Sequence, residues 1–210
     1  MRFRYADSLY VETRYRTMIA LIEKFCAPKD KIVVDLGAGN NAVSNYITCK
    51  KRIKIDFNEN SNPDIVHDLS SNIPLPDNSC DIVIAGEILE HIYFSKNFLW
   101  EIKRILRKEG DLIISVPNIC FLLYRIAWLL GTVPPFAAKA DYTYLPAGQI
   151  GGHVRDYSFK ELENILRSLN FDILKSTTNG LIYKKVYIPR FLIPKTFGQK
   201  IVILAKNNKD

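Results

Sequence analysis

The sequence has few cysteines, few histidines and no long apolar run. Its four cysteines stand far apart, at Cys26, Cys49, Cys80 and Cys120. The absence of a C-x-x-C pair argues against a zinc ribbon and predicts reduced thiols in a cytoplasmic protein. A chain of 210 residues can bury a sufficient core without disulfides, which excludes a small disulfide scaffold. The most apolar run, Phe121 to Leu130, contains Arg125 and is too short to span a bilayer. No apolar stretch follows Met1 to Tyr5, so we expect no signal peptide.

The composition is that of a globular protein with a basic surface. The 210 residues are 48% hydrophobic and 24% charged, which predicts a single domain over residues 1–210 and excludes a disordered or collagen-like chain. The net charge of +7, from 29 Lys and Arg against 22 Asp and Glu, favours anionic partners such as phosphorylated small molecules, RNA or acidic lipid headgroups. The basic residues form short scattered groups, which favours ordinary solvated surface over a dedicated nucleic-acid patch.

Apolar periodicity predicts strands that alternate with helices. We expect a leading amphipathic helix at 9–26 within residues 1–28, further helices at 41–48, 94–106 and after the S-x-x-E capping box at Ser158, and strands at 31–36, 52–56, 65–66, 81–85, 111–116, 171–177 and 200–206. This alternation predicts an α/β fold, a mostly parallel sheet covered by helices on both faces, with the last two strands as an antiparallel pair at one edge. Segments 118–152 and 180–199 fall outside the alternation and are predicted substrate-cap insertions.

A glycine-rich turn follows the first strand. The spacing Gly37-x-Gly39-x-x-Ala42 also satisfies the fingerprint of dinucleotide-binding proteins. Asp35 distinguishes the alternatives, because a buried carboxylate there would repel a pyrophosphate and attract an ammonium or sulfonium group. The turn therefore favours an amino-acid nucleoside, with an NAD-dependent oxidoreductase as the alternative. Asp56, about 20 residues on, suits ribose hydroxyls in either case.

Several motifs occur together in a fixed order. They are Val34 to Gly39, the acid Asp56, His67-Asp68-Leu69, Leu75 to Asp81, Ala85 to His91, Arg107 to Asp111, and Pro117-Asn118. As an ordered set they resemble class I S-adenosylmethionine-dependent methyltransferases, although Asn41 replaces the usual third glycine. The resemblance implies a Rossmann-like three-layer sandwich with a seven-stranded sheet in the order 3-2-1-4-5-7-6, strand 7 being antiparallel.

The resemblance also implies that S-adenosylmethionine is the cofactor and assigns its contacts. The methionine end would lie at Asp35, Gly37, Ala38 and Gly39, the ribose at Asp56 beside Phe57, the adenine near Asp68 and Leu69, and the junction with the acceptor at Glu87. For Asp68, a simple Asx turn is the structural alternative.

Three side chains are candidates for removing a proton from the acceptor. Glu87-x-x-Glu90-His91 follows the fourth strand, and His153 precedes the capping box. We expect His153, His91 and Glu87 to be catalytic, with His153 assisting deprotonation. The set is similar to the E-x-x-E-H and distant His of small-RNA 2′-O-methyltransferases. Glu87, Glu90, His91 and His153 would then bind a divalent metal, although a packing role for them is favoured.

The predicted activity is methyl transfer to an oxygen of a small-molecule or lipid- or glycan-linked acceptor. An RNA 2′-O-methyltransferase, an NAD-dependent oxidoreductase and a cofactor-binding protein without catalysis are the alternatives. The apolar segment Phe121 to Leu130 is predicted to be a helix that packs in the core. Otherwise it would receive an apolar acceptor or make peripheral contact with a membrane.

Overall fold

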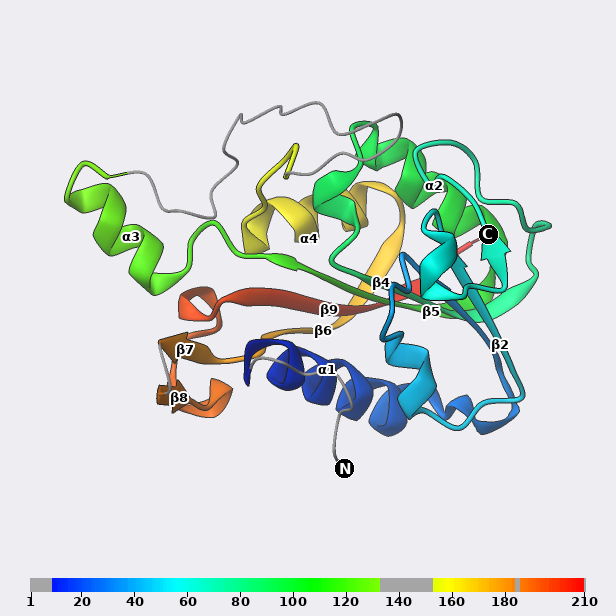
Figure 1. The fold of residues 1–210 in the computed structure, drawn as a ribbon, viewed down its shortest axis with the longest axis horizontal. Helices are drawn as coiled ribbons and strands as arrows, with labels where there is room; N and C mark the ends of the chain where they lie inside the picture. Colours follow the sequence, from blue (N-terminus) through cyan, green and yellow to red (C-terminus); the bar gives the residue numbers. More distant parts are fainter. Residues whose placement is uncertain (1–8, 133–152, 184–185, 210) are drawn as a thin grey trace.

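A seven-stranded sheet forms the centre of the computed structural model, which describes residues 9–132, 153–183 and 186–209 (Figure 1). Its strands are β1 (Ile32–Leu36), β2 (Lys51–Asp56), β3 (Ile65–Val66), β4 (Cys80–Gly86), β5 (Leu106–Pro117), β6 (Phe171–Thr178) and β9 (Lys200–Asn207). The order is β3-β2-β1-β4-β5-β9-β6, in which β9 runs antiparallel to both neighbours. This confirms the predicted fold, with β9 as the seventh strand of the expected order.

Helices cover both faces of the sheet, as predicted. Helix α1 (Leu9–Leu21), extended by one π-helical turn over Ile22–Cys26, lies on one face, and α2 (Ser95–Ile105) and α4 (Phe159–Ser168) lie on the other (Figure 1). The alternation of side chains along each strand divides the core accordingly. In β1, Val33 packs in the cluster under α1, whereas Val34 packs in the cluster under α2 and α4.

The helix faces follow from the sequence periodicity. In α2, Phe98, Leu99, Ile102 and Ile105 recur at helical spacing and are buried. Helix α4 begins at Ser158, whose Oγ accepts a hydrogen bond from the Glu161 N–H at 3.2 Å. The serine half of the predicted capping box therefore forms and satisfies one free N–H of the first helical turn.

The helix predicted at 41–48 is wrong. The structure has only a single 3-10 turn there, Val43–Tyr46. The Asn45 N–H donates to the Ala42 carbonyl at 3.1 Å and the Ile47 N–H donates to the Ser44 carbonyl at 3.4 Å, which are the bonds of a 3-10 turn and not of an α-helix. A segment of eight residues that contains β-branched and Asn residues cannot offset the cost of helix nucleation on its own.

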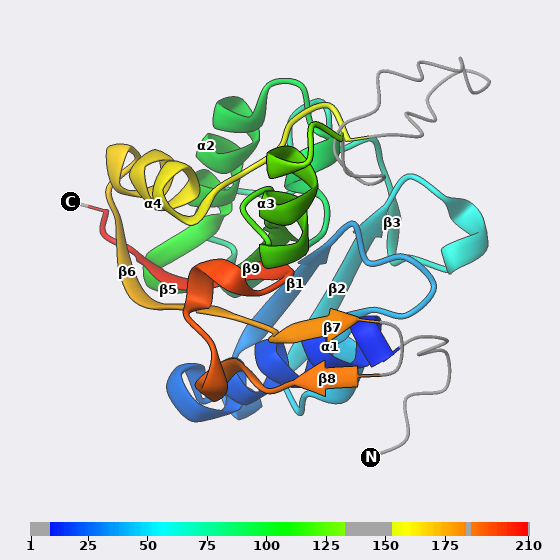
Figure 2. The ribbon, with the colours of Figure 1, turned by 90° about the vertical axis from the view of Figure 1, so that its left-hand side faces the viewer.

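Two segments leave the sheet beside each other. Pro117 at the end of β5 pairs with Lys200 at the start of β9, so the chain after β5 and the chain before β9 meet at one edge (Figure 2). The first segment carries α3 (Leu122–Leu129), and the second carries a hairpin of β7 (Leu181–Tyr183) and β8 (Val186–Ile188). Residues 133–152 of the predicted cap lie outside the described residues.

The expectation that Phe121 to Leu130 packs in the core is wrong. The helix is present as α3, but only Phe121 before it is buried, and its last turn is exposed. Phe121 packs against Tyr124, with ring centroids 5.3 Å apart, and this contact anchors only the first turn. The four cysteines are free. Among the described residues, no helix is both long and apolar enough to cross a membrane.

Candidate active site

Two adjoining cavities lie at the carboxyl ends of the parallel strands. Strand β1 has β2 on one side and β4 on the other, so the connections diverge there and leave a crevice. The first cavity, of about 760 Å³, is lined by residues that include Arg14, Tyr15, Asp35, Gly37, Ala38 and Gly39. The second, of about 270 Å³, is lined by residues that include Asp56, Phe57, Asp68, Leu69, Glu87 and His91. Gly37 lines both cavities and marks where they meet.

The turn after β1 requires glycine at two positions. Gly37 has φ +67° and Gly39 has φ +54°, a left-handed conformation that other residues adopt at a cost. A Cβ on Gly37 would also lie 3.0 Å from Cδ1 of Ile88, whereas one on Gly39 would meet open space. The Gly39 N–H donates to Asp56 Oδ2 at 2.7 Å, which ties the turn to the end of β2.

The first cavity contains a buried carboxylate and a buried guanidinium. Burial raises the pKa of Asp35 to about 6, although the Ser44 N–H stabilises its charged form. Arg14 reaches the same cavity from α1, and its Nη1 is buried with no hydrogen-bond partner among the described residues. A cavity that offers one anion and one cation suits a zwitterion. Arg14 was missed by the sequence reasoning; an arginine on the buried face of the amphipathic leading helix was the available signal.

The second cavity contains the other acids assigned from sequence. Asp56 is buried at the end of β2 and accepts from the N–H groups of Gly39 and Asn58, so its carboxylate is held in place beside the exposed ring of Phe57. Asp68 Oδ1 accepts from the Ser70 N–H at 2.8 Å. The Asx turn considered for Asp68 is therefore present, and the residue nonetheless lines the cavity beside buried Leu69.

Glu87 is held in a buried ion pair. Directly after β4 it has φ +61°, and its carboxylate pairs with Lys200 Nζ and lies 3.9 Å from Arg14 Nη1. Burial raises the pKa of Glu87, but Lys200 and Arg14 outweigh that effect and hold the pKa below its usual value. Lys200 was also missed by the sequence reasoning. A lysine at the start of the fully apolar run Ile201 to Ala205 was the signal that could have found it.

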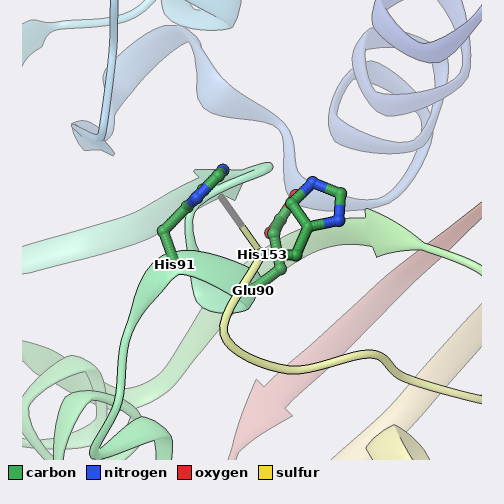
Figure 3. Close-up of side chains that lie close together, drawn as sticks. All are labelled: Glu90, His91 and His153. Atoms are coloured by element: carbon green, nitrogen blue, oxygen red, sulfur yellow. The ribbon is translucent and has the colours of Figure 1, made fainter. Parts of the chain in front are cut away.

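Glu90, His91 and His153 come together beside the second cavity (Figure 3). Their potential ligand atoms lie within 4.8 Å of one another, and the two imidazole rings meet edge to face at a centroid distance of 5.2 Å. The backbone explains the approach, because the Val154 N–H donates to the Glu90 carbonyl at 2.8 Å. The structure thus brings together three of the four candidate metal ligands. Glu87 is not among the three, since Lys200 holds its carboxylate.

Electrostatics favour neutral forms in this cluster. Burial and the charge of Glu87 hold the pKa of Glu90 well above its usual value, and Glu90 Oε2 has no hydrogen-bond partner among the described residues. Burial, His91 and Lys200 together lower the pKa of His153. Both shifts in pKa favour the uncharged form of the group, in Glu90 and in His153.

Comparison with known proteins finds methyltransferases in both sequence and structure. Residues 34–114 match the family described as a methyltransferase domain. A probable S-adenosylmethionine-dependent methyltransferase of Mycolicibacterium smegmatis is 24% identical over 177 residues, which are 80% of this chain and 62% of that protein. This chain spans between 42% and 62% of the length of the curated relatives it matches.

Solved structures share the fold. A possible histamine N-methyltransferase of Thermotoga maritima superposes with a TM-score of 0.64 at 17% identity and covers 94% of this chain and 92% of its own. A 1,6-didemethyltoxoflavin-N1-methyltransferase of Burkholderia thailandensis, solved with S-adenosylhomocysteine, gives 0.63 at 16% identity, over 99% of this chain and 84% of its own. Residues 34–114 therefore match a methyltransferase domain, and the chain shares its fold with solved S-adenosylmethionine-dependent methyltransferases.

Proposed function

We propose that this protein transfers the methyl group of S-adenosylmethionine to an oxygen of a small-molecule or lipid- or glycan-linked acceptor. One observation carries the proposal: Asp35 and Arg14 line the same cavity beside the glycine turn. The amino-acid end of the cofactor has an ammonium and a carboxylate, so it matches both side chains. A pyrophosphate would match Arg14 alone and would lie against the charge of Asp35.

The two cavities support a division of the cofactor between them. In this proposal the methionine end contacts Asp35, Gly37, Ala38 and Gly39 in the first cavity. The ribose lies at Asp56 and Phe57, and the adenine lies near Asp68 and Leu69, all in the second. Gly37 lines both cavities and lacks a side chain, so it leaves room for the cofactor to pass from one to the other. Glu87, which lines the second cavity with Gly37, would then face the methyl group of the cofactor.

His153 is the proposed base. When the acceptor oxygen attacks the methyl carbon, an O–C bond forms, the S–C bond breaks, and S-adenosylhomocysteine leaves. The acceptor's hydroxyl proton then passes to His153, whose depressed pKa keeps its imidazole neutral and able to accept it. His91 packs edge to face against His153 and positions the ring. Glu87, the third predicted catalytic residue, stays ionised beside Lys200, so we assign it to orienting the acceptor.

A second candidate is metal-assisted transfer to an RNA 2′-hydroxyl. Glu90, His91 and His153 offer one carboxylate and two imidazoles, a donor set that suits a divalent cation, and the partnerless Glu90 Oε2 is a free donor atom. A bound cation would lower the pKa of a coordinated hydroxyl. Strong inhibition by a chelator, restored by Mn²⁺ or Mg²⁺, together with turnover on RNA, would favour this candidate over the first.

Calorimetry and a transfer assay test the main proposal. We expect S-adenosylmethionine and S-adenosylhomocysteine to bind and NAD⁺ not to bind. With an accepted hydroxyl substrate, His153→Ala should lower kcat by about 10²- to 10⁴-fold with little change in cofactor affinity. Ser176→Ala, distant from the crevice on β6, is the control and should leave kcat unchanged. Binding of NAD⁺ alone would overturn the proposal, and unchanged turnover in His153→Ala would exclude the assigned base.

A further inference from the structure

The two segments that leave the carboxyl edge of the sheet have an unusual charge composition. Residues 118–132 and 180–199 contain no Asp or Glu, so all 22 acidic residues lie elsewhere in the chain. The same two segments contain five cationic residues: Arg125, Lys184, Lys185, Arg190 and Lys195. The charged residues of the two segments themselves are therefore all cationic, and one of them, Lys195, pairs with Glu163 of α4 at 2.8 Å.

These segments also expose large apolar side chains. Of the sixteen large hydrophobic side chains that are exposed in the described part of the chain, nine lie in them: Ile126, Trp128, Leu129, Leu130, Tyr183, Val186, Tyr187, Phe191 and Leu192. Leu129 is 86% exposed and Phe191 is 81% exposed. Side chains of this size in such a concentration indicate an interaction surface.

The two segments form one surface. Arg125 on α3 donates to the Thr196 carbonyl at 3.3 Å, and its guanidinium lies 5.0 Å from the ring centroid of Phe197. Asn118, which precedes α3, donates through Nδ2 to the carbonyl oxygens of Thr196 and Gly198. Figure 2 shows α3 and the β7–β8 hairpin on the same side of the molecule. We call residues 121–130, 181–183 and 186–195 together the apolar-basic surface.

We propose that the apolar-basic surface docks on an anionic lipid bilayer. Exposed Trp, Leu and Phe side chains fit the interface between headgroups and acyl chains, and cationic side chains without neighbouring acids in their own segments fit a surface of repeated negative charges. A protein partner would instead be expected to meet a mixture of both charges. Charge of one sign next to protruding apolar side chains therefore favours the bilayer.

The location relates the surface to the proposed active site. Lys200, which follows the second segment directly, pairs with Glu87 in the crevice, so the surface and the crevice share the carboxyl edge of the sheet. Docking would hold that edge near the headgroups. The docking does not depend on the proposed function, but the resulting acceptor class, a hydroxyl on a lipid-linked molecule, rests on it.

Vesicle co-sedimentation of the full chain tests the docking. The probes are vesicles of dioleoylphosphatidylcholine alone and vesicles with 30% dioleoylphosphatidylglycerol, each at low and high salt. We expect at least tenfold stronger partitioning onto the anionic vesicles, weakened by salt. Trp128→Asp and Phe191→Asp should each reduce the partitioning at least tenfold.

Matched variants separate a surface effect from a general one. Trp100, on α2, is 54% exposed, close to the 49% of Trp128, so Trp100→Asp introduces the same change outside the surface and should leave partitioning intact. Likewise Arg190→Glu should weaken partitioning more than Lys108→Glu does. Circular dichroism melting checks that each variant is folded.

Three outcomes would overturn the docking proposal. They are weak partitioning onto both kinds of vesicle, equal losses in Trp128→Asp and Trp100→Asp, and a concentration-dependent dimer that Trp128→Asp abolishes while vesicles bind nothing. Binding of S-adenosylhomocysteine is measured on the same samples. If vesicle binding fails while that ligand binds, only the docking is wrong. If vesicles bind while that ligand does not, only the proposed function is wrong.

Discussion

The carboxyl ends of β1 and β4 lie next to each other, and each places a carboxylate in the crevice. Asp35 at the end of β1 accepts a backbone N–H from Ser44, and burial raises its pKa to about 6. Glu87 after β4 is paired with Lys200, which holds its pKa below the usual value. The charge of Glu87 is thus neutralised by Lys200 of the protein itself. The charge of Asp35, in contrast, would be stabilised by a cationic ligand.

The difference between Asp35 and Glu87 indicates which carboxylate is available to a ligand. A buried acid with a raised pKa destabilises the ionised folded state, and a bound cation removes that cost. A buried acid that already has a lysine partner gains little from a second cation. We therefore expect changes at Asp35 to alter ligand affinity, and changes at the Glu87–Lys200 pair to alter stability first.

Removing Lys200 from its ion pair with Glu87 should have the largest effect on stability. Lys200→Met leaves Glu87 without its ammonium partner, and we expect the free energy of unfolding to fall by about 3–5 kcal/mol in urea denaturation. The double variant Lys200→Met/Glu87→Gln should recover most of the loss. Arg167→Met, which breaks an exposed pair with Glu163, is the matched control and should cost less than about 1 kcal/mol. Equal losses in the two single variants would contradict the comparison.

Removing the charge of Asp35, at the end of β1, should increase the free energy of unfolding. Because the folded-state pKa of Asp35 is raised from 3.8 to about 6, its ionisation costs stability as pH rises through this window. Asp35→Asn should therefore be more stable than the wild type at pH 7.5, by up to about 3 kcal/mol, and the advantage should disappear near pH 4. Urea unfolding of both proteins at pH 7.5 and near pH 4 measures this difference in stability. A variant that is less stable at pH 7.5 would refute the assignment.

The glycine turn beside Asp35 offers a smaller contrast. Gly37→Ala and Gly39→Ala each force alanine into a left-handed conformation, at about 1–2 kcal/mol. Only the Gly37 variant also brings a Cβ to 3.0 Å from Ile88, so its unfolding free energy should fall further. Thermal denaturation compares the two, and a larger loss in Gly39→Ala would show that the contact with Ile88 does not matter.

Features that depend on neighbouring residues could be predicted from the sequence. The alternation of strands and helices and the glycine turn followed from local patterns, because strand ends and turns are set by nearby residues. The strand order followed from the resemblance to a known family. Arg14 and Lys200 lie outside the motifs of that resemblance, and only their positions among apolar residues marked them in the sequence. They reach the crevice from α1 and β9, and their significance depends on long-range contacts with Glu87. Periodicity likewise predicted the helix at α3 but could not tell that nothing in the described chain covers its last turn.

The central claim is that Asp35 recognises the cationic amino-acid end of the cofactor. Calorimetric titration of the wild type and Asp35→Asn with S-adenosylhomocysteine and with 5′-methylthioadenosine, which lacks the amino-acid end, tests it most directly. We predict that Asp35→Asn weakens S-adenosylhomocysteine binding by about 10- to 100-fold, as expected for a lost charged hydrogen bond, and leaves methylthioadenosine binding unchanged. An equal loss for both ligands, or no loss for either, would contradict the claim.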